Sequence, residues 1–444
     1  MRLSFASSRR ILFVMVSVAL AIRLAIVPFV YQERINPARD HWRFGGETGR
    51  IARSIVEGKG FSSPFFADTG PTAWLTPVFP YLLAGVFKIF GVYSNASALV
   101  ILSLDCLFSA LTCIPVFFIA RKSFGARAAL WAGWLWAFFP LSIYFAADFI
   151  WDTSLATLLL PIVLLIALHL EDSPRLLHWL GFGAFAGFAA LTNPVSLSVA
   201  PFLALWLLYR YWKRRKEWFS LGAAALIGVV LIVSPWFLRN YRTFHHIVPL
   251  RSGLWFEFYC GNNADSWHWD PPGYHPSDSG TDWNEYQQLG ETAYMELKGK
   301  EARAFIGTHK ELYAEQTLRR IVYIWTGFWS FSKRYLAEEP MDPPNIFFLT
   351  SLTILALLGL RRAFREKGTA VAMPYLIVFI FFPLVYYITH PEDYYRRPMD
   401  PFFVVLAAYA ITTRFRGRTH VGDPVGAVDV TRSPGSIDLG HEQA

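Results

Sequence analysis

Apolar runs of about 20 residues recur along most of the chain, and short basic or longer polar connections separate them. A helix needs about 20 apolar residues to cross the hydrocarbon core of a bilayer. The pattern therefore predicts an all-α, polytopic transmembrane helix bundle of about ten spans. The predicted spans are residues 11–31, 97–120, 128–147, 153–170, 176–192, 195–211, 218–238, 344–360, 370–389 and 400–413.

The orientation of these spans follows from the basic residues between them, because Lys and Arg accumulate in cytoplasmic loops. The clusters are Arg9 and Arg10, then Arg121, Lys122 and Arg127, then residues 213–216, 361–367 and 414–418. Ten spans and a cytoplasmic N-terminus place every cluster on the cytoplasmic side. The same count places residues 32–95, 148–152, 240–345 and 390–401 outside.

Two further apolar stretches, residues 77–91 and 321–331, would break this alternation if they crossed the membrane. We therefore expect them to be juxtamembrane helices at the outer interface. Residues 240–345 keep a helical spacing of apolar positions and predict a small helical outer segment. The chain then divides into a membrane-embedded domain, residues 1–413, and a tail, residues 414–444, whose composition predicts a disordered cytoplasmic segment.

Composition agrees with a membrane protein, since 54% of the residues are hydrophobic and 17% are charged. The net charge of +8 is explained by the cytoplasmic loops, so it does not imply a nucleic-acid partner. The three cysteines, Cys106, Cys113 and Cys260, are scattered, and no His or Cys spacing predicts a zinc site. We expect neither a metal nor a cofactor.

The first outer loop, residues 32–95, carries candidate chemistry. Glu47 opens a stretch in which Ile51 and Ile55 share one helical face, and Gly45 and Gly46 leave room for a ligand beside its carboxylate. A carboxylate in this position can act as a general base. The alternative is that Glu47 only favours a helix N-terminus through the helix dipole.

Arginines on the predicted outer side run against the positive-inside bias. They are Arg239, Arg242, Arg251, Arg396 and Arg397. A guanidinium can bind a phosphate bidentately, which predicts phosphate ligands, with Arg239 and Arg397 preferred. The alternative for each is a long cation that reaches lipid head groups.

The short outer turn DFIWD adds Asp148 and Asp152 on the same side. These carboxylates could bind sugar hydroxyls or assist the base. Asp152 could equally cap the helix that begins with Thr153 and Ser154.

Several motifs together resemble the GT-C class of membrane glycosyltransferases. They are A-x-S-x-x-x-G-x-G-F at 52–61, FPYLLAGVFKIFG at 79–91, SPWFLRNY at 234–241, PLRSG at 249–253, GNN at 261–263 and DYYRRPMDPFFVVLAAYA at 393–410. This class includes protein O-mannosyltransferases, the aminoarabinose transferase of lipid A and transferases of lipopolysaccharide cores. The resemblance covers most of residues 10–413.

The resemblance implies a bacterial plasma-membrane enzyme that moves a sugar from a polyprenyl-phosphate donor, with inversion, on the extracytoplasmic face. Its acceptor would be a glycan, a lipid or a protein. Members of the class usually carry a catalytic aspartate in the first outer loop, where this chain has Phe44. Glu47 is then the nearest acidic candidate for the base, and Asp40 is the second.

Two other functions fit the same sequence. A transporter or flippase of a lipid-linked saccharide would carry ionisable residues in its spans, and Asp105 is one such residue. A ligase or polymerase of lipid-linked glycans would also use outer-face arginines. Because the polar residues gather on one side, the pattern favours an enzyme that works at that surface.

Overall fold

The computed structural model describes residues 5–34, 45–214, 217–264, 266, 275–277, 280–338 and 342–414, and all its regular elements within them are helical. The predicted tail lies outside these residues except for Arg414. The helices of the bundle are α1 (Phe5–Arg34), α4 (Asn95–Leu111), α5 (Cys113–Phe124), α6 (Ala126–Ala137), α7 (Pro140–Asp148), α8 (Thr153–Leu170), α9 (Leu176–Thr192), η2 (Pro194–Ser198), α10 (Ala200–Arg214), α11 (Trp218–Phe244), α17 (Asp342–Glu366), α18 (Thr369–Phe381), α19 (Leu384–Ile388), η3 (Arg397–Met399) and α20 (Asp400–Arg414).

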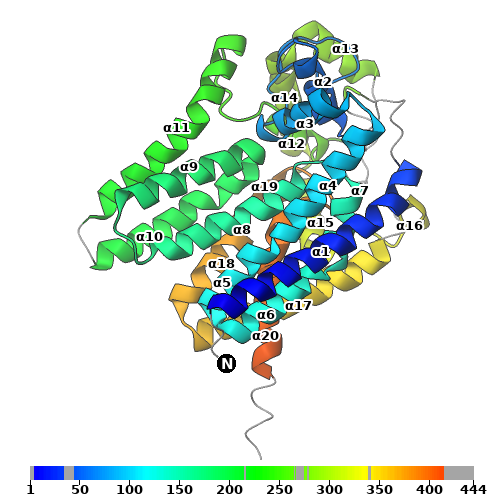
Figure 1. Cartoon of the computed structure of the whole chain (residues 1–444). Helices are drawn as coiled ribbons and strands as arrows, with labels where there is room; N and C mark the ends of the chain where they lie inside the picture. The colour runs from blue at the N-terminus through cyan, green and yellow to red at the C-terminus, as the bar shows by residue number, and fades with distance from the viewer. Residues whose placement is uncertain are drawn as a thin grey trace, which may run out of the picture.

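The remaining helices come from the two long connections that the sequence predicted to lie outside. They are α2 (Gly46–Val56), α3 (Val78–Phe90), α12 (Leu254–Cys260), α13 (Gly280–Leu289), α14 (Glu291–Thr308), α15 (Lys310–Thr326) and α16 (Lys333–Glu338). Helices α2, α3, α12, α13 and α14 gather at one end of the molecule, which we call the cap (Figure 1). The start of α1 and the end of α20 lie at the opposite end (Figure 1).

The prediction of a polytopic helical membrane protein is confirmed. Within the described residues, seven helical stretches are long and apolar enough to cross a membrane, or eight if the bent pair α6 and α7 counts as one span. Each of the ten predicted spans falls on one or two helices. Two of these helices, α9 and α20, have 17 and 15 residues, which is fewer than the about 20 that cross a bilayer. The predicted count of about ten is therefore approximate.

Two details differ from the sequence pattern. Residues 128–147 form two helices bent by 42°, because Pro140 begins α7 and cannot continue the hydrogen-bond ladder of α6. Of the two expected juxtamembrane helices, residues 77–91 form α3, whereas residues 321–326 are the last turns of α15 and residues 327–331 are irregular.

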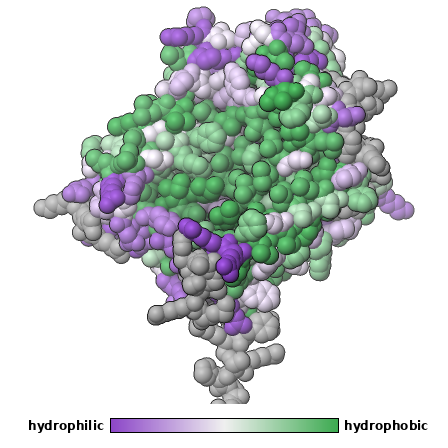
Figure 2. Space-filling model, in the orientation of Figure 1, coloured by the Kyte–Doolittle hydropathy of each residue, from purple (hydrophilic) through white to green (hydrophobic). Residues whose placement is uncertain are grey.

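Neighbouring helices of the bundle approach one another closely at glycine residues. A Cβ atom on Gly183 of α9 would lie 1.8 Å from the carbonyl oxygen of Ala225 in α11, so only glycine allows this approach. Gly359 of α17 meets Leu406 of α20 in the same way, at 2.1 Å. On the face shown in Figure 2, an apolar belt crosses the bundle, with hydrophilic residues over the cap and at the opposite end. The belt is the surface that lipid would cover.

Candidate active site

A cavity of about 860 Å³ lies where the cap meets the bundle. Cap helices α2 and α12 contribute to its wall, as do the loop before α8, the segment before α12 and the loop after α19. Its ionisable lining includes Glu47, Asp152, Arg251, Glu257, His275 and His390. Segments that are up to 351 residues apart in the sequence, from Glu47 to Pro398, thus meet around one space.

Glu47 lies in the first turn of α2, as the sequence predicted. Gly45 and Gly46 precede it with positive φ angles of 99° and 42°, a conformation that glycine adopts without strain. The Glu47 side chain is buried, and its Oε1 lies 2.8 Å from Nε2 of His275. Its Oε2 has no hydrogen-bond partner within the described part of the chain. One carboxylate oxygen is therefore available to a ligand.

The second predicted carboxylate of the first loop, Asp40, lies outside the described residues, as does Phe44. The structure therefore places Glu47 at the cavity and leaves the choice between Glu47 and Asp40 where the sequence left it.

Asp152 lies directly before α8 but does not cap it, because its carboxylate accepts no hydrogen bond from the first turn. Oδ2 instead accepts a hydrogen bond from Asn193 Nδ2 at 3.2 Å, and Oδ1 has no partner among the described residues. Burial raises the pKa of Asp152 to about 7, although Arg251, Asn193 and Arg397 act in the opposite direction. Asp148 is buried and lies outside the cavity lining.

Of the five predicted arginines, all of which are described, Arg251 is the one that lines the cavity. Its Nη2 forms an ion pair with Oε1 of Glu257. Burial alone would raise the pKa of Glu257, but Arg251 and His390 outweigh it and lower that pKa. Glu257 is therefore ionised, and Arg251 is the cation that a phosphate in this space would meet.

The other four arginines lie outside the cavity lining. Arg239 donates to the carbonyl oxygens of Thr72 and Phe61 at 2.6 and 2.7 Å, and Arg242 is exposed on α11. The remaining two are buried, with Arg396 bound to Asp400 at 2.7 Å and Arg397 bound to Thr153 Oγ1 at 2.9 Å. Arg239, Arg396 and Arg397 are thus bound by the protein outside the cavity lining, and their role as phosphate ligands stays a prediction. Arg251 is the predicted arginine that lies in the cavity wall.

The first loop is fixed against the rest of the cap by a buried carboxylate. Glu291, at the start of α14, accepts hydrogen bonds from Ala73 N at 2.8 Å and Ser252 Oγ at 2.7 Å, and also from Thr72 Oγ1. Together with Arg239, it joins the segment that contributes Trp74 to the segment that carries Arg251. The hydrogen bonds of Glu291 and Arg239 therefore hold this part of the cavity wall from behind, and they do not use the groups that face the space.

Aromatic side chains make up much of the remaining wall. Trp74, Trp151, Phe256 and Tyr394 all line the cavity. Trp74 and Phe256 belong to a cluster in which their ring centroids lie 5.1 Å apart, and His275 packs against both rings. Flat apolar surfaces beside carboxylates are typical of sites that bind small polar molecules with an apolar side.

The sequence reasoning missed Glu257 and His275 and gave His390 no role. A signal existed for Glu257, because a single acidic residue interrupts the aromatic run LWFEFYC. His390 is a single histidine at the end of an apolar run, and its spacing to other residues predicts no site. His275 carries no local signal, since it contacts Glu47 across 228 positions of sequence.

Comparisons with known proteins point in the same direction as the motifs. The family profile described as dolichyl-phosphate-mannose-protein mannosyltransferase matches residues 73–238. A comparison with curated protein sequences gave no match.

Solved structures show the fold. The oligosaccharyltransferase of Archaeoglobus fulgidus in its apo form has a TM-score of 0.52 at 14% identity, and the match covers 94% of this chain and 53% of that one. Its complex with zinc and sulfate has a TM-score of 0.51 at 15% identity, with 90% and 49% covered. ArnT from Cupriavidus metallidurans bound to undecaprenyl phosphate matches at a TM-score of 0.39 and 16% identity, with 90% and 77% covered.

This chain spans about half the length of the oligosaccharyltransferase chains that it matches. The resemblance to GT-C class membrane glycosyltransferases that the motifs indicated is confirmed. At these identities the structural comparison shows a shared fold, and the chemistry has to be argued from the cavity.

Proposed function

We propose that this integral membrane protein is a glycosyltransferase that moves a sugar from a polyprenyl-phosphate donor to an acceptor hydroxyl in the cavity beneath its cap. The observation that carries the proposal is the composition of that cavity. Glu47 and Asp152 each bring a carboxylate oxygen that has no hydrogen-bond partner within the described residues, and Arg251 lies in the same wall. Base and phosphate-binding cation are the two groups that such a transfer needs.

The proposed reaction uses these groups as follows. Glu47 takes the proton of the acceptor hydroxyl while that oxygen forms a bond to the anomeric carbon. The bond from the anomeric carbon to the phosphate oxygen breaks, and its electron pair stays on the phosphate beside Arg251. Asp152 accepts hydrogen bonds from sugar or acceptor hydroxyls. Attack opposite the leaving phosphate inverts the anomeric carbon.

The proposed side is extracytoplasmic. The cap lies at the end of the molecule opposite to the start of α1 and the end of α20 (Figure 1). Arg9 and Arg10 lie near the start of α1, and the positive-inside rule assigns such clusters to the cytoplasm. This orientation supports an acceptor and a donor that meet outside, and the membrane we propose is a bacterial plasma membrane.

Two alternatives are separated by one experiment. Purified protein in proteoliposomes is incubated with radiolabelled sugars on polyprenyl phosphate and with glycan, lipid and peptide acceptors. We expect labelled acceptor and free polyprenyl phosphate in equal amounts. Movement of intact donor between leaflets without a product would support a transporter and overturn the proposal. Transfer of a whole lipid-linked glycan, with no transfer of single sugars, would support a ligase or polymerase.

A further inference from the structure

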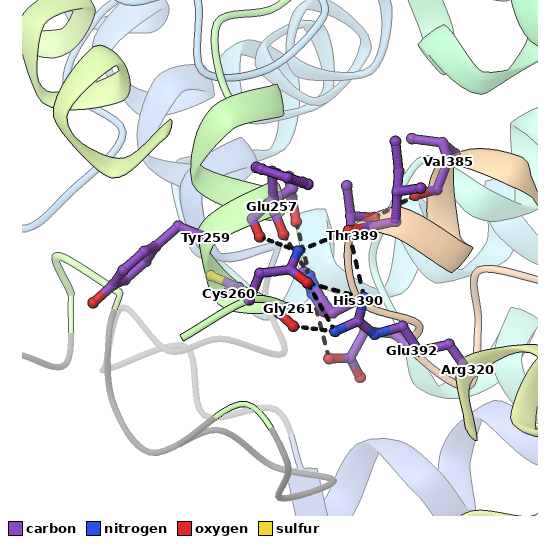
Figure 3. Close-up of polar contacts among 12 residues, drawn as sticks. Glu257, Tyr259, Cys260, Gly261, Arg320, Val385, Thr389, His390 and Glu392 are labelled. Carbon is purple, nitrogen blue, oxygen red and sulfur yellow. Dashed lines mark hydrogen bonds and ion pairs between the residues drawn. The ribbon is translucent and has the colours of Figure 1, made fainter. Parts of the chain in front are cut away.

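Glu257 is shared between two basic side chains in the wall of the cavity. Its Oε1 pairs with Nη2 of Arg251. Its Oε2 lies 3.4 Å from Nδ1 of His390, and Figure 3 shows these two side chains together. Apart from this ion pair, Arg251 makes no hydrogen bond within the described residues. Its other N–H groups are therefore available to a ligand, while one carboxylate connects it to a titratable imidazole.

A buried guanidinium holds Glu257 and His390 in place. Arg320 of α15 is 1% exposed and donates to the carbonyl oxygen of Gly261, just after α12, and to that of Ile388, at the end of α19. The C-termini of α12 and α19 thus both lie at the Arg320 guanidinium (Figure 3). A cation at a helix C-terminus is favoured by the helix dipole. A Cβ on Gly261 would lie 2.0 Å from the carbonyl oxygen of Thr389, so the two chain segments are in direct contact. The distance between Glu257 and His390 is therefore fixed by packing.

The groups that face His390 come from four segments. Glu257 lies on α12, Arg320 on α15 and Arg251 on the loop before α12, and Glu392 on its own loop approaches Nε2 at 3.8 Å. The ring of Tyr395 lies 5.8 Å away. Burial lowers the pKa of His390, and Glu257 only partly opposes this shift. At neutral pH the imidazole is therefore mostly uncharged.

We propose that His390, acting through Glu257, sets how much positive charge Arg251 presents to the phosphate of the donor. This inference rests on the proposed function. While His390 is neutral, Glu257 compensates Arg251 alone. Once His390 is protonated, it compensates Glu257, and Arg251 carries an unbalanced positive charge toward the phosphate. Donor binding and protonation of His390 are then coupled, and binding tightens as the pH falls.

The test is direct binding of undecaprenyl methyl phosphate, which keeps the lipid and the phosphodiester and omits the sugar. As a phosphodiester it does not change its charge in this range, so any pH dependence belongs to the protein. Its Kd is measured in nanodiscs between pH 5.5 and 7.5. We expect the wild-type Kd to be about tenfold higher at pH 7.5 than at pH 5.5, which lies within the limit of tenfold per pH unit that one coupled proton allows.

Two variants shift binding in opposite directions, which a simple loss of structure would not do. His390→Gln is expected to bind more weakly than wild type at low pH and to lose most of the pH dependence. The remainder comes from Asp152, which lines the same cavity and acts electrostatically on Arg251. Glu257→Gln removes the charge that opposes Arg251 and is expected to bind tightly at every pH. His309→Gln, an exposed histidine outside the cavity, is the matched control and should follow wild type.

The inference is overturned if His390→Gln keeps the wild-type pH dependence, or if Glu257→Gln binds more weakly than wild type at every pH. Thermal unfolding checks that each variant is folded, and the Glu257→Gln result decides alone if His390→Gln is not. Absence of wild-type binding at every pH would overturn the proposed function and this inference with it. Binding that is independent of pH in wild type would overturn this inference alone.

Discussion

One buried charged group in the bundle and two at the junction beneath the cap are satisfied in opposite ways. In the bundle, Arg23 of α1 is 0% exposed, and its guanidinium donates to Ser109 Oγ at 2.8 Å, Ser142 Oγ at 2.7 Å and the carbonyl oxygen of Ala137 at 3.1 Å. At the junction, Glu47 and Asp152 each keep one oxygen without a hydrogen-bond partner among the described residues.

This difference distinguishes buried polar groups that stabilise the fold from buried polar groups that can bind a ligand. A buried polar group without a partner costs about 1–3 kcal/mol, so a fold keeps one where a ligand can complete it. Arg23 connects α1, α4 and the bend between α6 and α7, and its neutral acceptors satisfy it. Asp105 of α4 is also buried, and it interacts with the backbone of Trp151 and electrostatically with Arg397 and Asp152, so it faces the junction.

The largest expected effect is on catalysis. Glu47→Gln keeps the size of the side chain and removes the base, so we expect kcat to fall by about 10²- to 10⁴-fold with little change in the unfolding temperature. The control is Glu57→Gln at the exposed end of the same helix, where the carboxylate pairs with Lys59 at 3.1 Å. Equal activity in both variants would remove Glu47 from the proposed mechanism and leave Asp40 as the candidate base.

The second effect is on stability, and it belongs to the bundle. Arg23→Met leaves hydroxyl and carbonyl acceptors from four helices without their donor, and we expect the free energy of unfolding to fall by about 3 kcal/mol. Thermal unfolding in detergent measures the change. The kcat of the protein that remains folded should stay within about twofold of wild type. If Arg23→Met unfolded like wild type but lost turnover, Arg23 would have a functional role and not the structural role given to it here.

A smaller effect concerns pH. Because the pKa of Asp152 is raised to about 7, the carboxylate is mostly protonated below that pH. At saturating donor, where the pH dependence of binding does not enter, we expect kcat to rise by up to tenfold per pH unit toward pH 7 and to level off above it. The raised pKa also means that this group stabilises the fold most at low pH, and that the contribution is lost as the pH rises through 7. Asp152→Asn should flatten both dependences, and an unchanged profile would count against Asp152.

The smallest effect is expected at Arg242, which is exposed in the last turn of α11. Arg242→Ala should change neither turnover nor the KM for the donor by more than about twofold, because surface substitutions seldom exceed ±0.5 kcal/mol. Arg251→Ala, measured beside it, should raise the donor KM strongly. Similar effects of the two substitutions would show that position in the cavity does not decide which arginine binds phosphate.

The sequence predicted most of the helices, because an apolar run of about 20 residues matches the length that a helix needs to cross the membrane. It could not separate Arg239 from Arg251, which are only 12 positions apart. Both fall in the same outer segment, and only the path of the chain after α11 directs one to the backbone of the first loop and the other to the cavity. Nor could it pair Glu47 with His275 or Glu257 with His390, since these contacts join cap segments to one another and to the bundle.

The most direct test of the account is a structure of the protein with a bound donor analogue, undecaprenyl phosphate linked to a non-transferable sugar. We predict density for the phosphate at Arg251 and for the sugar between Glu47 and Asp152, inside the cavity beneath the cap. A phosphate bound instead at Arg239, Arg396 or Arg397, with the cavity empty, would contradict the account.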